Sequence, residues 1–209
     1  ENIIVTDLMG VVYAGRPALM DPWKRAHARE TDLRTLSEAI DGADIFLGLS
    51  AGGVLKPDMV ARMARDPLIM ALANPVPEIM PDVVKGVRTD AMICTGRSDF
   101  PNQVNNVLCF PHIFRGALDC GATAITEEME LAAVHALAAL TRETLDDPAS
   151  LGEAPLIPSP FDPRLIVRIA PAVARAAAEC GVATRPILDL ADYAETLGRR
   201  LNAASEAAL

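Results

Sequence analysis

The sequence contains few aromatic residues and no long apolar run, and each absence restricts what the chain can be. Aromatic residues make up 4% of its 209 residues, so aliphatic residues and methionine must form most of the core. No apolar run approaches the roughly 18 residues that a membrane-spanning helix needs. The chain also opens without the pattern of a signal peptide. We therefore expect no membrane partner and a cytoplasmic location.

Basic residues are outnumbered by acidic ones. The 19 Lys and Arg residues stand against 28 Asp and Glu residues, which gives a formal net charge of -9. The charges are well mixed and form no basic block, so the chain should repel nucleic-acid phosphates. We expect no nucleic-acid partner. With 51% hydrophobic and 22% charged residues, the composition is that of a globular protein.

The sequence lacks the short spacings of metal sites and of disulfide frameworks. Its four cysteines include no CxxC pair, and its three histidines form no zinc-like cluster with them. The cysteines have small or apolar neighbours, so we expect buried free thiols in a reducing compartment. They are Cys94, Cys109, Cys120 and Cys180.

Short apolar runs alternate with helical patterns in the first half of the chain. Four nearly continuous runs predict strands buried on both faces, at residues 2–6, 45–49, 68–73 and 91–95. Apolar residues at helical spacing predict helices over 31–40 and 56–65. This rhythm indicates βαβ units, so the predicted fold class is α/β with a Rossmann-like parallel sheet.

The second half of the chain is predicted to be helical. The apolar stretch 104–118 contains Pro111, where we expect the helix to kink or to restart. Thr126, followed by two glutamates, predicts the start of the next helix. Five prolines over 146–163 predict a linker over 146–162. Two Ala-rich helices should follow, and Gly181 is a natural end for the first.

Small or hydrogen-bonding residues follow each predicted strand. They are Asp7, residues 48–53, Asn74-Pro75 and residues 96–99. Ligands of open parallel sheets bind outside the carboxyl ends of the strands. At these positions a backbone without bulky side chains can approach a ligand, and side-chain amides can recognise it.

Asp7 resembles the acid that binds the adenosine ribose in a dinucleotide fold. Such an acid follows a glycine fingerprint by about 20 residues, and no GxGxxG occurs in the sequence. We therefore expect the chain to lack the first βα unit and its phosphate-binding loop. The alternative is that Asp7 only caps the end of a strand.

Four carboxamides over 102–106 form a second candidate site, because they precede a predicted helix. Carboxamides donate hydrogen bonds to carboxylates without adding charge, and a helix N-terminus contributes oriented N–H groups. The arrangement suits a small anionic substrate such as a hydroxy or keto acid. Ordinary capping and turn formation by Asn is the alternative.

Several segments of the sequence resemble malic enzymes. They are GLSAGGVLKPDMV (48–60), ALANPVPEI (71–79), TGRSDFPNQVNNVLCFPHIFRGALD (95–119) and ATAITEEMELAAV (122–134). The block TGRSDFPNQVNNVLCFP is the most specific of them. The tail over 158–187 resembles the bacterial multidomain type, in which a phosphotransacetylase-like domain follows the malic enzyme part.

The resemblance implies a domain organisation and an activity. Residues 1–145 would be a partial NAD(P)-binding domain, 146–162 a Pro-rich linker, and 163–209 a helical segment leading to a following domain. The parent enzyme would oxidise malate and decarboxylate the product to pyruvate and CO2, with NADP or NAD and with Mg2+ or Mn2+. It would be a homo-oligomer.

The resemblance also assigns site residues by motif. Asn74 of the ANP motif and Asn106 of the QxNN motif would contact the substrate and the nicotinamide end of the cofactor. Asp7, Gly48, Ser50, Gly52 and Asn105 complete the predicted cofactor-binding set. The catalytic Tyr and Lys of the family and its metal ligands have no match here, so we expect this chain alone to be inactive.

The cofactor preference depends on the residues around Asp7. Asp7 would favour a free ribose 2′-OH, and hence NAD. Four basic residues that follow it could instead hold a 2′-phosphate: Arg16, Lys24, Arg25 and Arg29. Bacterial multidomain malic enzymes mostly favour NADP, so the resemblance favours NADP.

Two other interpretations are open at this point. The chain could belong to an α/β dehydrogenase of the amino-acid dehydrogenase type, although such enzymes are not expected to carry the QVNNV block. It could also be a non-catalytic docking or oligomerisation module, because the Ala-rich helices after Pro163 suit close helix packing.

Overall fold

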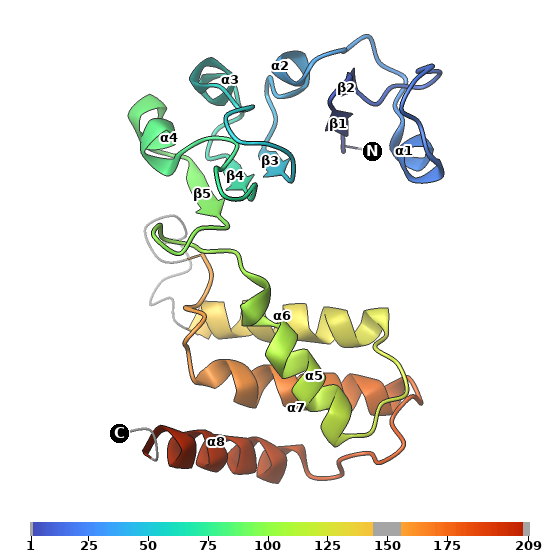
Figure 1. Cartoon of the computed structure of the whole chain (residues 1–209), viewed down its shortest axis with the longest axis vertical. Coiled ribbons are helices and arrows are strands. Elements are labelled where there is room, and N and C mark those ends of the chain that lie inside the picture. The colour runs from blue at the N-terminus through green and yellow to red at the C-terminus, as the bar shows by residue number, and fades with distance from the viewer. Residues whose placement is uncertain (1, 144–155, 207–209) are drawn as a thin grey trace. The chain divides into compact units, whose positions relative to one another are not determined.

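The computed structural model describes residues 2–143 and 156–206, which fall into two compact units. Unit 1 comprises residues 1–101 and unit 2 comprises residues 102–209. Unit 1 contains all the strands of the described residues, and unit 2 contains the four longest helices (Figure 1). None of the described helices combines the length and the apolar character needed to cross a membrane.

Three parallel strands form the sheet of unit 1. They are β3 (Ile45–Gly48), β4 (Leu68–Ala71) and β5 (Met92–Thr95), hydrogen-bonded in that order. Helix α3 (Pro57–Ala61) lies between β3 and β4 in the chain, and α4 (Pro81–Val87) lies between β4 and β5. The predicted α/β class and these three strands are confirmed.

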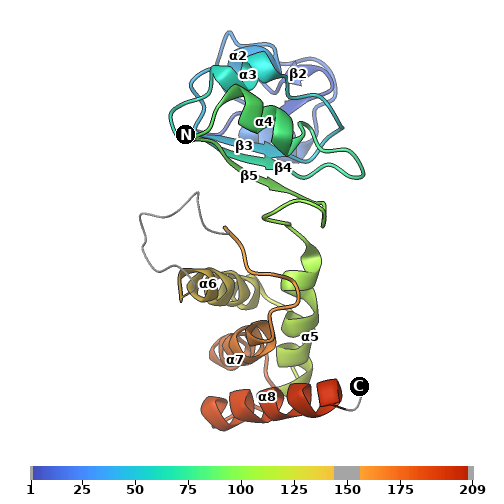
Figure 2. The same ribbon diagram turned by 90° about the vertical axis from the view of Figure 1, so that its left-hand side faces the viewer.

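Helices cover one side of this sheet. Figure 2 shows α3 and α4 on the same side of the three strands. Phe46 and Ile69 are buried in the core of unit 1, whereas Ile45 and Leu47 on the other face of β3 are 58% and 56% exposed. The prediction of burial on both faces is therefore wrong for β3 in this structure, because an apolar run does not reveal which face a neighbouring element covers.

The first predicted strand, over residues 2–6, is expected to join the parallel sheet, but the structure has a short antiparallel hairpin there. Strand β1 (Thr6–Asp7) pairs antiparallel with β2 (Gly10–Val11). The backbone N–H of Met9 donates a hydrogen bond to Asp7 Oδ1 at 2.9 Å, which closes the turn between them. The parallel strand over 2–6 is thus wrong in this structure, because Thr6 and Asp7 pair within a local hairpin instead.

Prolines mark the starts of helices in unit 1. Pro22, Pro57 and Pro81 occupy the first turn of α1 (Pro22–His27), α3 and α4, where the missing N–H breaks no helical hydrogen bond. Helices α1 and α4 were not predicted, because 6 and 7 residues show little apolar periodicity.

The helices predicted over 31–40 and 56–65 are present but shorter. Helix α2 is restricted to Leu36–Ala39, and α3 ends at Ala61. Thr35 and Glu38 form a capping box that begins α2 at Leu36.

Unit 2 is built around one central helix. Its described helices are α5 (Phe110–Asp119), α6 (Glu127–Glu143), α7 (Arg164–Glu179) and α8 (Leu190–Glu206), with a short 3₁₀ helix η1 (Asn106–Leu108) before α5. Helix α7 packs against each of the other three long helices. The prediction that the stretch 104–118 restarts at Pro111 is confirmed, because Pro111 lies in the first turn of α5.

Small residues allow α5 and α7 to approach closely. Ala170, Ala174 and Ala177 of α7 are all at most 1% exposed. Gly116 of α5 faces the backbone of Ala170, and a Cβ at Gly116 would collide with the carbonyl oxygen of Ala170 and lie 3.0 Å from Val173 Cβ. Gly116 thus permits this helix contact.

A polar network and a backbone bridge connect the ends of these helices. Tyr193 of α8 donates its hydroxyl hydrogen bond to Asp119 Oδ2 at 2.7 Å, while Arg115 donates to both oxygens of Asp119 at 2.7 and 2.6 Å. Ala122 and Ala183 form an antiparallel bridge after α5 and α7. Gly181, with φ of 73°, follows the end of α7 as predicted.

The predicted division of the chain into 1–145, 146–162 and 163–209 stays a prediction. Residues 144–155 lie outside the described residues. Helices α6 and α7, which flank the predicted linker, pack against each other within unit 2.

The cysteines are free thiols, as expected, but they are not all buried. Cys94 and Cys120 are buried, Cys109 is half-buried and Cys180 is exposed. The expected burial is therefore wrong for Cys180, which lies at the end of α7.

Substituting Gly116 tests the contact between α5 and α7. We expect Gly116→Ala to lower the midpoint of thermal unfolding, because the added methyl group forces the two helices apart, at a cost of about 1–3 kcal/mol. Gly198→Ala in α8 is the matched control, since its Cβ would lie 3.7 Å from Val167 Cγ1, an ordinary contact. Alanine should raise helix stability there by up to about 1 kcal/mol. Equal effects of both substitutions would contradict this account.

Candidate functional site at the carboxyl ends of the strands

The register of the parallel sheet brings three predicted ligand-binding segments to one edge. Gly48 of β3 pairs with Ala71 of β4, which pairs with Thr95 of β5. The three strands therefore end level, and the segments that follow them leave from the same edge of the sheet. Thr95 is fully buried, and its hydroxyl accepts a hydrogen bond from the backbone N–H of Arg97 at 3.3 Å, which turns the chain after β5.

Asn74 lies beside Gly96 at this edge. A Cβ at Gly96 would be 2.8 Å from Asn74 Nδ2 and 3.1 Å from its Oδ1, so the amide lies where a side chain at residue 96 would be. Asn74 is exposed, and a cis peptide bond joins it to Pro75. The exposed amide offers both a donor and an acceptor to a ligand at this edge.

The segment after β3 presents backbone without bulky side chains. Ser50, Gly52 and Gly53 are exposed. Gly53 adopts a φ of 73°, and no atom lies within 4 Å of the position of its missing Cβ. A dinucleotide could approach the main chain closely here, so these residues fit the predicted cofactor-binding segment.

Gly48 has a different environment from the rest of this segment. It is buried, and a Cβ at this position would collide with the carboxyl group of Glu78. The absence of a side chain at Gly48 therefore makes room for Glu78.

Glu78 is a residue at this edge that the sequence analysis missed. It is fully buried, and its Oε1 accepts a hydrogen bond from Ser50 N at 2.8 Å while its Oε2 accepts one from Ala73 N at 3.0 Å. The segment ALANPVPEI contains Glu78, but nothing in its pattern shows that this carboxylate is buried. The contact joins residues far apart in the sequence, so only the fold reveals it.

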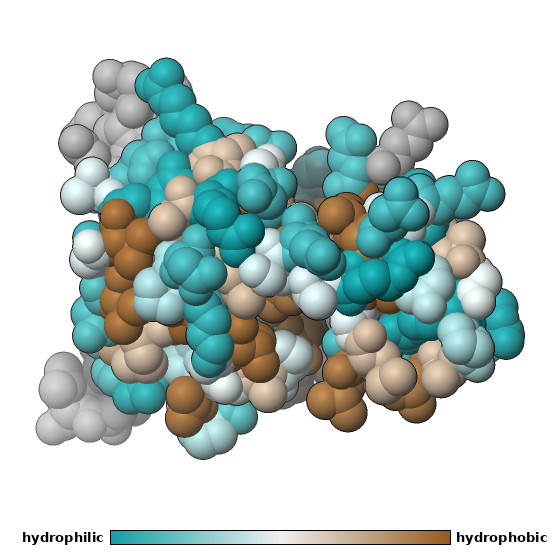
Figure 3. Space-filling view, turned by 90° about the horizontal axis from the view of Figure 1, so that it is seen from above, coloured by the Kyte–Doolittle hydropathy of each residue, from teal (hydrophilic) through white to brown (hydrophobic). Residues whose placement is uncertain are grey.

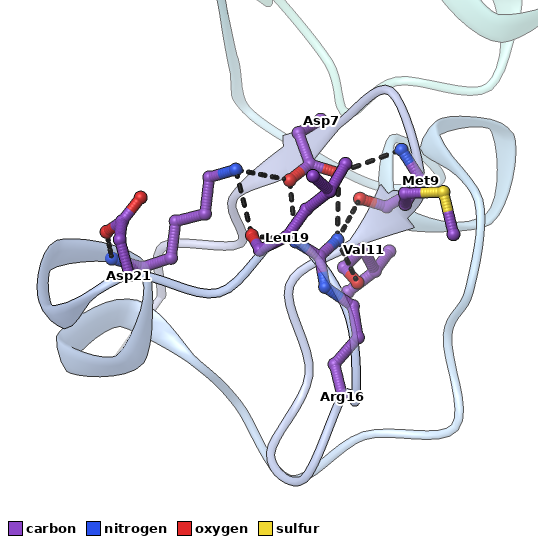
Figure 4. A network of polar contacts seen from close by, with 8 residues as sticks. Asp7, Met9, Val11, Arg16, Leu19 and Asp21 are labelled. Atoms are coloured by element: carbon purple, nitrogen blue, oxygen red, sulfur yellow. Dashed lines mark hydrogen bonds and ion pairs between the residues drawn. The ribbon is translucent and has the colours of Figure 1, made fainter.

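The predicted cofactor acid Asp7 is held by two basic residues (Figure 4). Arg16 Nη1 donates to Asp7 Oδ1 at 2.8 Å, and Arg16 Nη2 donates to Oδ2 at 2.6 Å. Lys24 Nζ donates to the same Oδ2 at 2.7 Å. The Arg16 guanidinium, and then Lys24, hold the pKa of Asp7 far below its ordinary range, although partial burial opposes this.

The four basic residues expected near a 2′-phosphate differ in their availability. Arg16 and Lys24 pair with Asp7, and the Arg16 side chain is only 3% exposed. Arg29 Nε donates to the carbonyl oxygen of Ile3 at 3.1 Å. Arg25 is exposed in α1, and the Lys24 side chain is 30% exposed.

The carboxamide segment lies in unit 2, and much of it shapes the local chain. Asn105 caps η1 by accepting a hydrogen bond from Val107 N at 3.0 Å, and Asn102 Oδ1 accepts one from Leu156 N at 2.7 Å. Asn106 is exposed at the start of η1. Because Asn74 belongs to unit 1 and Asn106 to unit 2, the geometry within either unit does not place these two amides together.

The predicted site residues gather no metal-ligating cluster in the described part of the chain, and a groove in unit 2 lies away from them. Within residues 2–143 and 156–206, no three or more His, Cys, Asp and Glu side chains gather as metal ligands would. An open groove between α6 and α7 is lined by apolar residues together with His135, two arginines and three glutamates, and it contains none of the predicted site residues.

Comparison with known proteins identifies the family. The family described as "Malic enzyme, NAD binding domain" matches residues 1–178 of the chain. The chain belongs to this malic enzyme family. The match decides against the amino-acid dehydrogenase alternative.

Individual malic enzymes match almost the whole chain. The "NAD-dependent malic enzyme" of Rhizobium meliloti is 66% identical over 95% of this chain, and the "NADP-dependent malic enzyme" of Salmonella typhimurium is 59% identical over 94% of it. The chain covers 27% of each of these relatives, so it spans about a quarter of their length.

Solved malic enzyme structures have the same fold. The crystal structure of Entamoeba histolytica malic enzyme matches with a TM-score of 0.81 and 30% sequence identity, over 97% of this chain and 43% of that one. The malic enzyme of Pyrococcus horikoshii matches with a TM-score of 0.71 and 37% identity, over 86% of this chain and 41% of that one.

The Asp7 ion pairs predict how the stability of this malic enzyme domain depends on pH. A carboxyl group whose pKa is lowered by folding contributes stability above its unfolded pKa, and the contribution is lost as the pH falls below that value. The ordinary pKa of Asp7 is 3.8. We expect the free energy of unfolding to fall as the pH decreases from about 4, and Asp7→Asn to reduce this slope.

Urea unfolding at a series of acidic pH values measures the effect of Asp7→Asn. Asp21→Asn is the matched control, because Asp21 only caps α1 and Asn caps helices equally well. If Asp7→Asn and wild type lose stability with the same slope, the Asp7 ion pairs do not stabilise the folded chain.

Proposed function

We propose that this chain is part of the dinucleotide-binding domain of an enzyme that oxidises malate and decarboxylates the product to pyruvate and CO2. The observation that carries the proposal is the exposed Asn74 amide beside Gly96, at the carboxyl edge of a parallel sheet that belongs to the malic enzyme family. Bound NAD(P)+ would accept the hydride from malate at this edge.

The residues of the chain would bind and orient rather than exchange protons. The Asn74 amide would hydrogen-bond the substrate carboxylate or the nicotinamide carboxamide, since it offers both a donor and an acceptor. The exposed backbone at Ser50 and Gly52 would line the dinucleotide. Gly48 would leave room for the Glu78 carboxyl group, which accepts a hydrogen bond from Ser50 N. Asn106, supported by Asn105, would also contact the substrate and the nicotinamide end of the cofactor, as the family resemblance implies.

The remaining chemistry would come from parts of the parent enzyme outside this chain. The described residues hold no cluster that fits a metal ion, so the Mg2+ or Mn2+ that the family resemblance implies would be bound elsewhere. The catalytic Tyr and Lys also have no match here. The isolated chain should therefore not turn over malate.

Removing the Asn74 amide tests the proposed activity. In the full-length enzyme, assayed by malate-dependent formation of reduced cofactor and of pyruvate, we expect Asn74→Ala to lower kcat/KM for malate about 100-fold, because a ligand-orienting amide is lost. Thr89→Ala is the control, since Thr89 is exposed and precedes β5, at the opposite edge of the sheet. Wild type that forms no pyruvate from malate would refute the proposed function.

We further propose that the cofactor is NADP. Both oxygens of Asp7 already accept charge-assisted hydrogen bonds, so the carboxylate is a poor acceptor for the ribose 2′-OH of NAD. Together, Asp7, Arg16 and Lys24 carry a net positive charge, and the exposed Arg25 adds to it. This charge favours a 2′-phosphate, although the Rhizobium meliloti relative is named as NAD-dependent.

Neutralising the two accessible cations tests this preference. Lys24→Ala and Arg25→Ala should each raise KM for NADP about tenfold while changing KM for NAD little, because only NADP carries the 2′-phosphate. Lys85→Ala, on the exposed face of α4, is the control. An unchanged ratio of kcat/KM for the two cofactors in both variants would remove these residues from cofactor selection.

The location and the assembly state stay predictions as well. Free thiols are typical of a reducing compartment, so we propose a cytoplasmic enzyme.

Brown apolar areas lie among hydrophilic residues on the face shown in Figure 3. Phe110, Phe114 and Leu118 of α5 are 48–69% exposed, and such residues are typical of surfaces that another domain or subunit covers. We therefore propose a homo-oligomer of the full-length enzyme.

A further inference from the structure

We propose that Glu78 is a positioning residue, whose buried carboxylate fixes the segments after β3 and β4 relative to each other and thereby sets the position of the Asn74 amide. The proposal deepens the proposed function and rests on it where turnover is measured. Nothing in the sequence motifs assigns a role to Glu78.

The first argument is the placement of the hydrogen bonds. Oε1 of Glu78 accepts from the backbone N–H of Ser50 at 2.8 Å and lies 3.4 Å from its hydroxyl oxygen, which also donates to it. Oε2 accepts from the backbone N–H of Ala73 at 3.0 Å. One carboxylate thus joins the proposed dinucleotide segment to the residue directly before Asn74.

The second argument is that main-chain hydrogen bonds hold Glu78 itself in place. Leu55 N donates to the carbonyl oxygen of Glu78 at 3.1 Å, and Gly53 N donates to that of Pro77 at 3.0 Å. The backbone of residues 77–78 is therefore attached to the segment after β3. Its side chain then accepts hydrogen bonds from Ser50 in the segment after β3 and from Ala73 at the start of its own segment after β4.

The third argument is that three glycines leave room for this arrangement. A Cβ at Gly48 would collide with the Glu78 carboxyl group, and one at Gly52 would lie 2.7 Å from Val76 Cβ. A Cβ at Gly96 would be 2.8 Å from Asn74 Nδ2. With so little free space, a shift of the carboxylate or of Asn74 would have to move neighbouring backbone.

The chemistry of the carboxylate explains why a neutral isostere would not serve. An ionised carboxylate only accepts hydrogen bonds, so it can receive one N–H at each oxygen. A glutamine side chain has the same shape but carries an NH2 group in place of one oxygen. The NH2 group of glutamine would then face the backbone N–H of Ser50 or of Ala73, and two donors cannot hydrogen-bond each other. One of the two hydrogen bonds from the main chain would therefore be lost.

A double-mutant cycle in the full-length enzyme tests whether Glu78 acts through Asn74. We expect Glu78→Gln to lower kcat/KM for malate about tenfold in the wild-type background and less than about twofold when Asn74 is already alanine. Glu30→Gln, at an exposed glutamate of unit 1, should have no effect in either background. Equal losses in the two backgrounds, or a lowered unfolding midpoint with unchanged kinetics, would overturn the proposal.

Hydrogen exchange provides a readout that does not depend on turnover. Glu78→Gln should accelerate amide exchange in both segments, 49–53 and 72–76, whereas Glu30→Gln should accelerate neither. Unchanged exchange in either segment would overturn the positioning role, even if wild type proved inactive with malate. If Glu78→Gln does not fold, Gly48→Ala displaces the same carboxylate while keeping its charge, and it should give the same kinetic and exchange results.

Discussion

Hydrogen bonding between β3, β4 and β5 in a level, parallel register is the constraint on which the candidate site depends. Because Gly48, Ala71 and Thr95 are paired across the sheet, the chain leaves all three strands at one edge. Side chains far apart in the sequence then come within contact distance there. Without this register, Glu78 could not reach Ser50, and Asn74 would not lie against Gly96.

Close packing at this edge depends on residues that have no side chain. The carboxyl group of Glu78 fills the space that a side chain at Gly48 would take, and the amide of Asn74 fills that space at Gly96. The same principle operates in unit 2, where Gly116 lets α5 approach the backbone of α7. In both units a glycine creates the space that a functional or structural neighbour fills, which differs from the usual role of glycine in turns.

The carboxylates of Asp7 and Glu78 are stabilised by different kinds of partner. Asp7 is neutralised by two cations and remains partly exposed, so its ion pairs can influence a ligand at the surface. Glu78 is fully buried, and it accepts hydrogen bonds from two backbone N–H groups and one hydroxyl. Directed hydrogen bonds from fixed main chain hold a side chain more narrowly than long flexible cations do, which suits a positioning role.

Local patterns in the sequence determined the α/β class, the three parallel strands, the restart at Pro111 and the positions of Asn74 and Asn106 at element ends. These features depend on apolar periodicity and on residues that end strands or begin helices. The tertiary structure alone decided that Asp7 belongs to a hairpin, that one face of β3 is exposed, and that Glu78 bridges two strand ends. The hairpin depends on the pairing of Asp7 with Gly10, which the apolar run over 2–6 does not show. The exposed face of β3 depends on which face a neighbour covers, and the Glu78 bridge depends on Ser50, which is distant in the chain, so apolar spacing encodes neither of them.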